Sequence, residues 1–199
     1  MTDMTTSFLE LSARHQRRAW ALVRQLDITG AWRAVGAEAH LVGSLRMGLL
    51  MKHRDIDFHV YSSPLRLADS FAAVARLAER PGVEGITFRN LLHTDEACVE
   101  WHMDCRDAEG DVWQIDMIHL VRGSRYDGYF ERMADRIRAV LTLETRATIL
   151  YLKNATPDDM KVMGVEYYQA VLRDGVRTWD DFLAWRRDHP QRGIVEWMP

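Results

Sequence analysis

The chain has 199 residues, of which 47% are hydrophobic and 28% are charged, and its net charge is −3 at pH 7. These values are typical of a globular protein with a substantial core, and they exclude an overall basic field that would attract nucleic acid. No apolar run reaches membrane-spanning length, and the first residues lack the apolar stretch of a signal peptide. With only two cysteines, the expected location is the reducing cytoplasm.

Helical and strand-like patterns alternate in the first half of the chain. Ser7 and Glu10 have the spacing of a capping box, and the periodicity around them predicts a helix over 9–26. The Ser63-Pro64 pair predicts the start of a second helix, which would run to about Glu79. Apolar runs bounded by Gly, Pro and Ser predict three strands, at 39–42, 56–61 and 83–88.

Residues 98–120 predict a β-hairpin whose register follows from the sequence pattern. Hydrophobic and polar residues alternate in both halves of this segment. Pairing Cys105 with Trp113 therefore sets apolar side chains against apolar side chains, whereas a slip of one residue does not. The same register leaves a three-residue loop with Gly110 in the left-handed position, which is a favoured hairpin geometry.

The last third of the chain is helical in its periodicity. One long helix is predicted over 129–152, and two further helices are predicted to begin at the capping patterns of Thr156 and Thr178. The whole order of elements predicts an α+β fold with a small mixed sheet. The expected organisation is one domain over 1–122 and a helical region over 123–199 that packs on it.

Three carboxylates stand in strand-like segments. Asp55 and Asp57 are two residues apart, so both side chains project from one strand face, roughly 6.6 Å apart at Cα. Asp116 lies opposite His102 in the predicted hairpin and joins them if the two strands are neighbours. Such acids repel one another, and they are explained as ligands of hard divalent cations. Asp104, on the same predicted face as Asp116, is the alternative third acid.

A glycine-punctuated segment upstream of these acids predicts contacts to phosphate. Gly43 lets backbone amides approach an anion, and the hydroxyl of Ser44 can donate to a phosphate oxygen. Arg46 and Arg54 bring positive charge to the same segment. These four residues are the predicted nucleotide-binding residues.

The succession Gly43-Ser44, Gly48 and Asp55-Ile56-Asp57 resembles the signature of the DNA polymerase β-like nucleotidyltransferase superfamily, over about residues 38–120. The resemblance implies that Ser44 contacts a triphosphate and that Asp55 and Asp57 bind two magnesium ions, or manganese ions in their place. It also implies that Asp116 ligates one ion and acts as a base. Arg54 is a departure, because many members have a serine or another small residue before the first acid.

The implied activity is transfer of a nucleoside monophosphate from a nucleoside triphosphate, such as ATP, to a hydroxyl group, with release of pyrophosphate. The expected acceptor is a small molecule or a protein, because the acidic charge balance argues against nucleic acid. No membrane partner is expected. Two alternatives stay open: a non-catalytic nucleotide- or partner-binding module on the same fold, and an RNA-processing enzyme.

Overall fold

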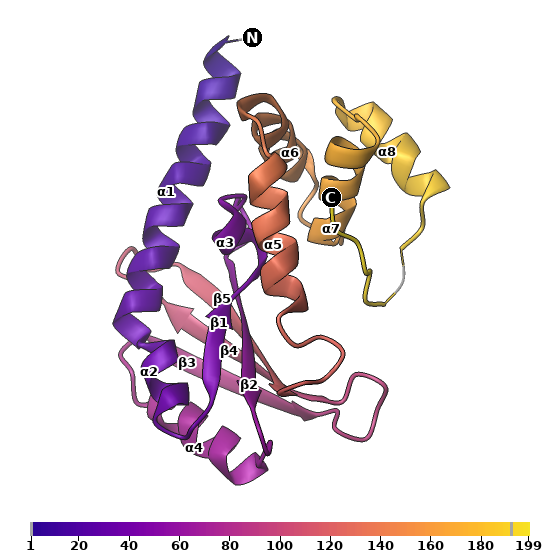
Figure 1. Cartoon of the computed structure of the whole chain (residues 1–199). Coiled ribbons are helices and arrows are strands. Elements are labelled where there is room, and N and C mark those ends of the chain that lie inside the picture. The colour runs from indigo at the N-terminus through magenta and orange to yellow at the C-terminus, as the bar shows by residue number, and fades with distance from the viewer. Residues whose placement is uncertain (1, 192) are drawn as a thin grey trace.

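The structure is a computed structural model, and it describes residues 2–191 and 193–199. It contains a five-stranded mixed sheet with the strand order β1-β2-β5-β4-β3 (Figure 1). The β2–β5 pair is parallel, and the other neighbouring pairs are antiparallel. The predicted α+β fold with a small mixed sheet is therefore confirmed. The strands are β1 (Glu38–Leu41), β2 (Asp55–Ser62), β3 (Val83–Asn90), β4 (Cys98–Arg106) and β5 (Val112–Val121).

Helices precede, interrupt and follow the strands (Figure 1). In the part of the chain that the structure describes, none of them is long and apolar enough to cross a membrane. The helices are α1 (Thr2–Leu26), α2 (Ile28–Arg33), α3 (Gly43–Met47), α4 (Leu67–Ala78), α5 (Tyr129–Val140), α6 (Leu143–Ala155), α7 (Gly164–Tyr168), the π-helical turn η1 (Gln169–Arg173) and α8 (Trp179–Asp188).

One face of the sheet forms the first hydrophobic core. Alternate residues of β2, among them Ile56 and Phe58, point to this face and are almost fully buried. The C-terminal half of α1 packs on them together with α2 and α4, through residues such as Leu22, Trp32 and Leu77. Because side chains of a strand alternate between its two faces, this packing directs the intervening polar residues of β2 to the opposite face.

A second hydrophobic core joins the C-terminal helices to the segment that follows β1. Residues of α5 to α8 form most of it, and Met47, Leu49 and Met51 from the segment between β1 and β2 are buried among them. The N-terminal half of α1 lies against this core as well, through Leu11 and its neighbours. The helical region is thus anchored beside the connection that carries Gly43 and Ser44. The division at residue 122 stays a prediction.

The hairpin has the predicted register. Cys105 is paired with Trp113, and His102 lies opposite Asp116. The loop closes through a backbone hydrogen bond from Asp107 N–H to the Asp111 carbonyl, and Gly110 has a φ of +88°. The alternation of apolar and polar residues was therefore sufficient to determine this pairing.

Several predicted helix boundaries are wrong. The first helix already begins at Thr2, so Ser7 lies inside it and caps nothing at its start. The glycine-punctuated segment contains the short helix α3. The helix expected from Ser63-Pro64 begins later, at Leu67 with Arg66 as its N-cap residue. The start predicted at Thr178 is confirmed, because its side chain accepts a hydrogen bond from Asp181 N–H.

The long helix expected over 129–152 is two helices. Leu141 has an extended backbone and ends α5, and Thr142 begins α6 in a capping box with Thr145. The start expected at Thr156 is wrong too, because this residue ends α6 and its hydroxyl donates to the Leu152 carbonyl at 2.8 Å. Helical periodicity continues through such a break, so periodicity alone did not reveal it.

Candidate active site

The three predicted acids lie on the face of the sheet opposite the first core. In the parallel β2–β5 pair, Asp57 is the direct partner of Asp116, and Asp55 is the partner of Gln114. Asp55, Asp57 and Asp116 line one cavity of about 390 Å³. Asp104 lines neither this cavity nor the larger one described below, so the structure brings Asp116 and not Asp104 to the other two acids.

The carboxylates act on one another electrostatically. Enclosure in the protein and the negative charges of Asp55 and Asp116 raise the pKa of Asp57 to about 8, and Lys153 opposes this shift. An ordinary aspartate is already ionised well below neutral pH. At Asp57 the surroundings make the ionised form unfavourable, so ionising this side chain in the folded protein costs free energy. A bound cation would remove this cost.

Asp116 is oriented by two neighbours that the sequence analysis did not assign to the site. The Nδ1 atom of His102 is 2.6 Å from Asp116 Oδ1. The side-chain amide of Gln114 donates to both carboxylate oxygens, at 2.8 and 3.1 Å. Gln114 precedes Asp116 by two residues on the same strand face, so the period-2 alternation was the signal that could have identified it.

Gly43 lies directly against the carboxylate of Asp57. The backbone of Val42 donates a hydrogen bond to the Asp57 carbonyl at 2.9 Å, which brings the end of β1 onto β2. Gly43 begins α3 with a φ of +64°, and a Cβ atom there would lie 1.9 Å from Asp57 Oδ2. Glycine is therefore required twice, by the backbone conformation and by the approach of the acid.

The substitution Gly43→Ala is expected to destabilise the protein and to displace Asp57. Gly48→Ala is the matched control, because Gly48 also has a positive φ, +73°, but a Cβ atom there meets nothing within 4 Å. The control should cost about 1–2 kcal/mol for the left-handed backbone alone. Chemical denaturation should show a larger loss for Gly43→Ala, and equal losses in the two variants would contradict the contact with Asp57.

Ser44 is held by a lysine from the helical region. Lys153 of α6 donates from Nζ to Ser44 Oγ at 2.7 Å and to the Leu49 carbonyl at 3.0 Å. The hydroxyl of Tyr168 is 3.3 Å from the same Ser44 oxygen. Lys153 is the main site residue that sequence reasoning missed, because nothing local marks a lysine of a distant helix as a neighbour of Ser44.

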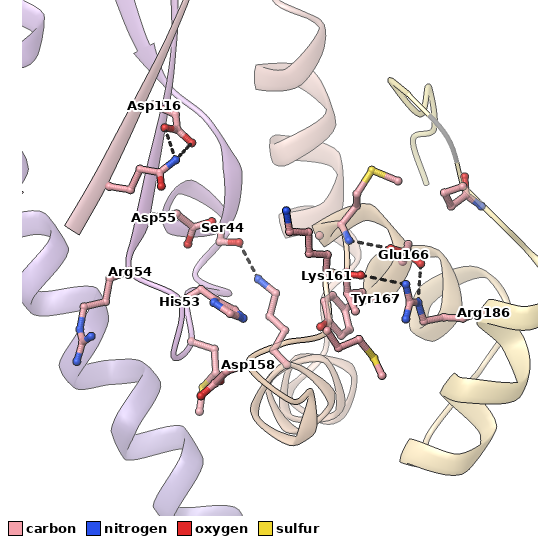
Figure 2. A pocket seen from close by; sticks show the side chains of 18 of the residues that line it. Ser44, His53, Arg54, Asp55, Asp116, Asp158, Lys161, Glu166, Tyr167 and Arg186 are labelled. Carbon is pink, nitrogen blue, oxygen red and sulfur yellow. Dashed lines mark hydrogen bonds and ion pairs between the residues drawn. The ribbon is translucent and has the colours of Figure 1, made fainter. Parts of the chain in front are cut away.

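The two predicted arginines lie differently from one another. Arg46 pairs with Asp135 at 2.8 Å and donates to the Leu41 carbonyl at 3.0 Å. It lines neither cavity, so the structure does not bring it to the acids. Arg54 lines the larger cavity and pairs with Asp111 at 3.0 Å, and Figure 2 shows its side chain directed away from Asp55.

The larger cavity, of about 950 Å³, separates the sheet from the helical region (Figure 2). Ser44, Asp55 and Asp116 contribute to its wall on the sheet side. Lys161, Tyr167, Glu166 and Arg186 lie across from Ser44 and Asp55 in Figure 2. Arg186 is partly neutralised by Glu166 at 2.7 Å. Acids on one wall and cations on both sides of a cavity of this size suit a ligand that carries phosphate groups and a metal ion.

His59 continues the face of β2 that carries Asp55 and Asp57. Burial lowers the pKa of His59 to about 4, so its imidazole is neutral at physiological pH. The Tyr61 hydroxyl is 3.3 Å from His59 Nδ1. The ring of Phe130 packs edge-on against the imidazole, with 4.8 Å between the two ring centroids. This face of β2 therefore carries acidic side chains at Asp55 and Asp57 and a neutral imidazole at His59.

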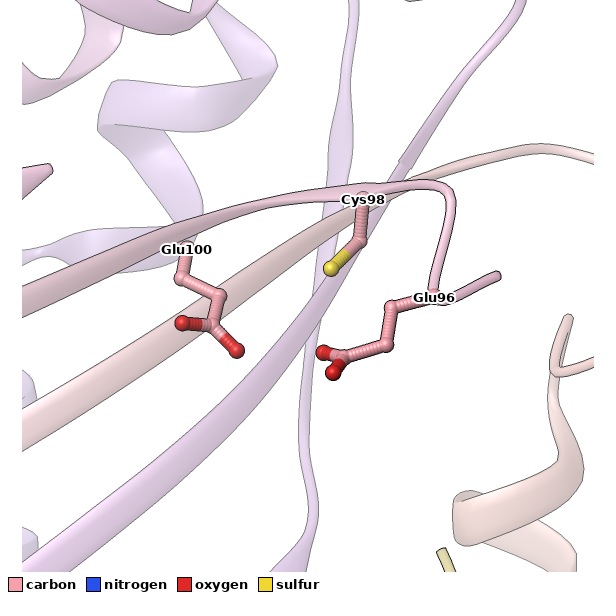
Figure 3. Close-up of side chains that lie close together, drawn as sticks. All are labelled: Glu96, Cys98 and Glu100. Atoms are coloured by element: carbon pink, nitrogen blue, oxygen red, sulfur yellow. The ribbon is translucent and has the colours of Figure 1, made fainter. Parts of the chain in front are cut away.

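The donor chemistry of Asp55, Asp57 and Asp116 fits magnesium, which prefers oxygen ligands. Within the described residues, one set of three potential ligands has all its ligand atoms within 4.8 Å of one another, and it is a different set: Glu96, Cys98 and Glu100 (Figure 3). Burial and the two acids raise the pKa of Cys98 to about 11, so it is a protonated thiol at neutral pH. Glu100 also pairs with Arg89 at 2.8 Å, and we assign no ion to this set.

No family model matches the sequence, and no curated protein sequence is significantly similar to it. Solved structures are similar in fold. Cid1 poly(U) polymerase with bound MgGTP has a TM-score of 0.60 and 17% identity, over 85% of this chain and 55% of that chain. A cytoplasmic RNA terminal U-transferase has a TM-score of 0.58 and 14% identity, over 86% and 54%. The non-canonical poly(A) polymerase complex GLD-2–GLD-3 has a TM-score of 0.56 and 11% identity, over 86% and 58%.

The chain thus has the fold of these polymerases, which are members of the DNA polymerase β-like nucleotidyltransferase superfamily. The resemblance predicted from Gly43-Ser44 and Asp55-Ile56-Asp57 is confirmed at the level of the fold. The chain spans a little more than half of the length of the structures that it matches.

Proposed function

We propose that the protein is a metal-dependent nucleotidyltransferase. The observation that carries this proposal is the arrangement of Asp55, Asp57 and Asp116 on one face of the sheet, on the neighbouring strands β2 and β5, where they line a cavity with Ser44 at the start of α3. Carboxylates that repel one another are costly unless they bind a cation, and this cost is concentrated on Asp57. The fold shared with nucleotidyltransferases supports the same reaction class.

In this proposal the nucleoside triphosphate occupies the larger cavity. The hydroxyl of Ser44 and the backbone amides at the start of α3 would donate hydrogen bonds to phosphate oxygens. Lys153, which already donates to Ser44 at 2.7 Å, would add positive charge to the same group. Lys161 and Arg186 lie across the cavity and are available to more distant parts of the nucleotide.

The transfer step would join the acceptor oxygen to the α-phosphorus of the nucleotide. The acceptor hydroxyl forms the new P–O bond, the bond between the α-phosphorus and its bridging oxygen breaks, and pyrophosphate leaves with that electron pair. Asp116 would accept the hydroxyl proton, with its carboxylate held by His102 and Gln114. Asp55, Asp57 and Asp116 would hold magnesium, which when bound neutralises phosphate charge in such a transfer.

The proposed acceptor is a hydroxyl group of a small molecule or a protein. RNA is the second candidate, because the Cid1 structures are described as those of an RNA terminal uridylyl transferase and of its complex with the short product ApU. The charge balance of −3 argued against RNA, but the similarity to these polymerases does not support that exclusion. The acceptor therefore has to be tested with both classes.

The proposal is tested by binding and by transfer. Magnesium with a nucleoside triphosphate at about a hundred times its Kd should raise the Tm by roughly 5–10 °C. Incubation with each α-labelled nucleoside triphosphate should then label a component of a small-molecule extract, a protein extract or an RNA pool.

Lys153→Met should raise KM for the nucleotide about tenfold or more, because it removes a cation next to Ser44.

Three outcomes separate the alternatives. A Tm shift without transfer to any acceptor would favour a non-catalytic nucleotide-binding module. Labelling of RNA, with an RNA affinity that falls as salt is added, would favour an RNA nucleotidyltransferase. Absence of a magnesium- and nucleotide-dependent Tm shift would contradict the proposed function itself.

A further inference from the structure

The cavity of about 390 Å³ that contains all three acids differs in character from the larger one. Phe130, Met133 and Ala134 of α5 line it, and Ile118 of β5 adds a further apolar side chain. The C-terminal segment 193–195 borders it as well. Its lining is therefore mostly apolar and drawn from elements far apart in the sequence.

The two cavities meet at the acids. Ser44, Asp55 and Asp116 line both of them, whereas Lys153, Lys161 and Arg186 line the larger one alone. A group transferred at this junction would pass from a donor molecule in one cavity to an acceptor molecule in the other. The cation-rich cavity suits the triphosphate, which leaves the smaller cavity for the acceptor.

The charge of the smaller cavity limits the kind of acceptor that it can take. Of the described residues that line it, none is a lysine or an arginine, and its acidic groups are the carboxyl groups of Asp55, Asp57 and Asp116. An RNA end brings phosphates, which proteins bind mainly with cationic side chains and backbone amides. The apolar lining offers contact area instead, and the Phe130 ring, packed edge-on on His59, provides an aromatic surface.

We propose that this cavity binds the acceptor, and that the acceptor is an uncharged small molecule with an apolar body of one or two rings and a hydroxyl group that points to the acids. This inference rests on the proposed function. A volume of about 390 Å³ lies toward the lower end of the range of small-molecule sites, about 300–1,000 Å³, and suits one such molecule.

The direct test is binding of 2-(2-naphthyl)ethanol, a neutral two-ring alcohol, measured by ligand-observed NMR on the full chain. Ala134→Phe fills the cavity and should weaken binding at least tenfold. Ala139→Phe, at an exposed position of the same helix, is the matched control and should leave binding unchanged. Phe130→Ala is the second variant. It removes the aromatic ring from the cavity wall without filling the cavity, and it should also weaken binding.

The result expected for the wild type is a Kd below about 1 mM for the naphthyl alcohol. The trinucleotide UpUpU should neither bind as tightly nor displace the alcohol at physiological salt. Undetectable binding of the alcohol, equal binding in all four proteins, or displacement by UpUpU would each overturn the inference. Loss of binding in Ala134→Phe and Phe130→Ala, with the control intact, would support it.

The Tm shift with magnesium and nucleotide, measured separately, keeps this test distinct from that of the proposed function. If the nucleotide shifts the Tm and the alcohol does not bind, the acceptor class is wrong and the nucleotidyltransferase proposal stands. If the alcohol binds and the nucleotide produces no shift, the apolar site stands as a binding site and the proposed reaction is wrong.

Discussion

Asp57→Asn is expected to lower nucleotidyl transfer by at least about 10³-fold, which corresponds to about 4 kcal/mol of transition-state stabilisation. The asparagine keeps the shape of the side chain against Gly43 but removes the charge that would hold a cation. The same change should stabilise the ligand-free protein, because it relieves the repulsion from Asp55 and Asp116. A substitution that lowers activity while it raises stability cannot owe its loss of activity to unfolding, so the replaced side chain has a functional role.

Asp104→Asn is the matched control for this experiment. Asp104 is an exposed acid on β4, the strand beside β5, and it lines neither cavity. Its replacement should change neither the rate of pyrophosphate release nor the Tm shift with magnesium and nucleotide. If Asp57→Asn kept more than about a tenth of the activity, or if Asp104→Asn were equally damaging, the three-acid site would be wrong.

The contribution of Asp57 to the free energy of unfolding of the ligand-free protein should fall as the pH rises from about 4 to about 8. The pKa of Asp57 is raised from 3.8 to about 8, so the folded protein keeps a proton in this window that the unfolded chain has already released. Folding then takes up a proton at Asp57, and the contribution of this residue to stability decreases with increasing pH until its folded-state pKa is passed. Magnesium, which binds the ionised form, should oppose the decrease and should stabilise the protein more at pH 8 than at pH 6.

The measurement is urea denaturation at several pH values with a chelator and with magnesium. Other groups titrate too, so the informative quantity is the difference in unfolding free energy between the wild type and Asp57→Asn. This difference should grow with pH in the chelator and shrink when magnesium is added. A difference that is constant between pH 5 and pH 8 would show that Asp57 ionises normally and that the acids do not repel strongly.

Local alternation predicted the parts of the site that lie on strands. The register that sets His102 opposite Asp116 was correct, because a slip of one residue would have turned the hydrophobic side chains to the wrong face. The common face of Asp55 and Asp57 followed from the same period of two. The pairing of β2 with β5 does not follow from the sequence, since nothing in either strand specifies a parallel neighbour.

The ends of helices, and the identity of the cationic side chains near the site, were predicted less well. The break at Leu141 and Thr142 interrupts a continuous periodicity, so it had no distinct hydrophobic signal. Arg46 was expected at the phosphate site because it follows Ser44 closely in sequence, yet it pairs with Asp135 of α5. Closeness in sequence was a poor guide on the short helix α3, because successive helical residues point in different directions.

The sequence by itself determined the strands, the hairpin register and the shared face of the first two acids, because these depend on side-chain periodicity within a few residues. The tertiary structure decided which groups meet the acids from outside the sheet. Burial of Met47, Leu49 and Met51 among the C-terminal helices fixes α6 beside α3, and this places Lys153 on Ser44. Likewise, α5 and the segment 193–195 enclose the apolar cavity next to Asp57 and Asp116, and such long-range packing has no local pattern from which it could be predicted.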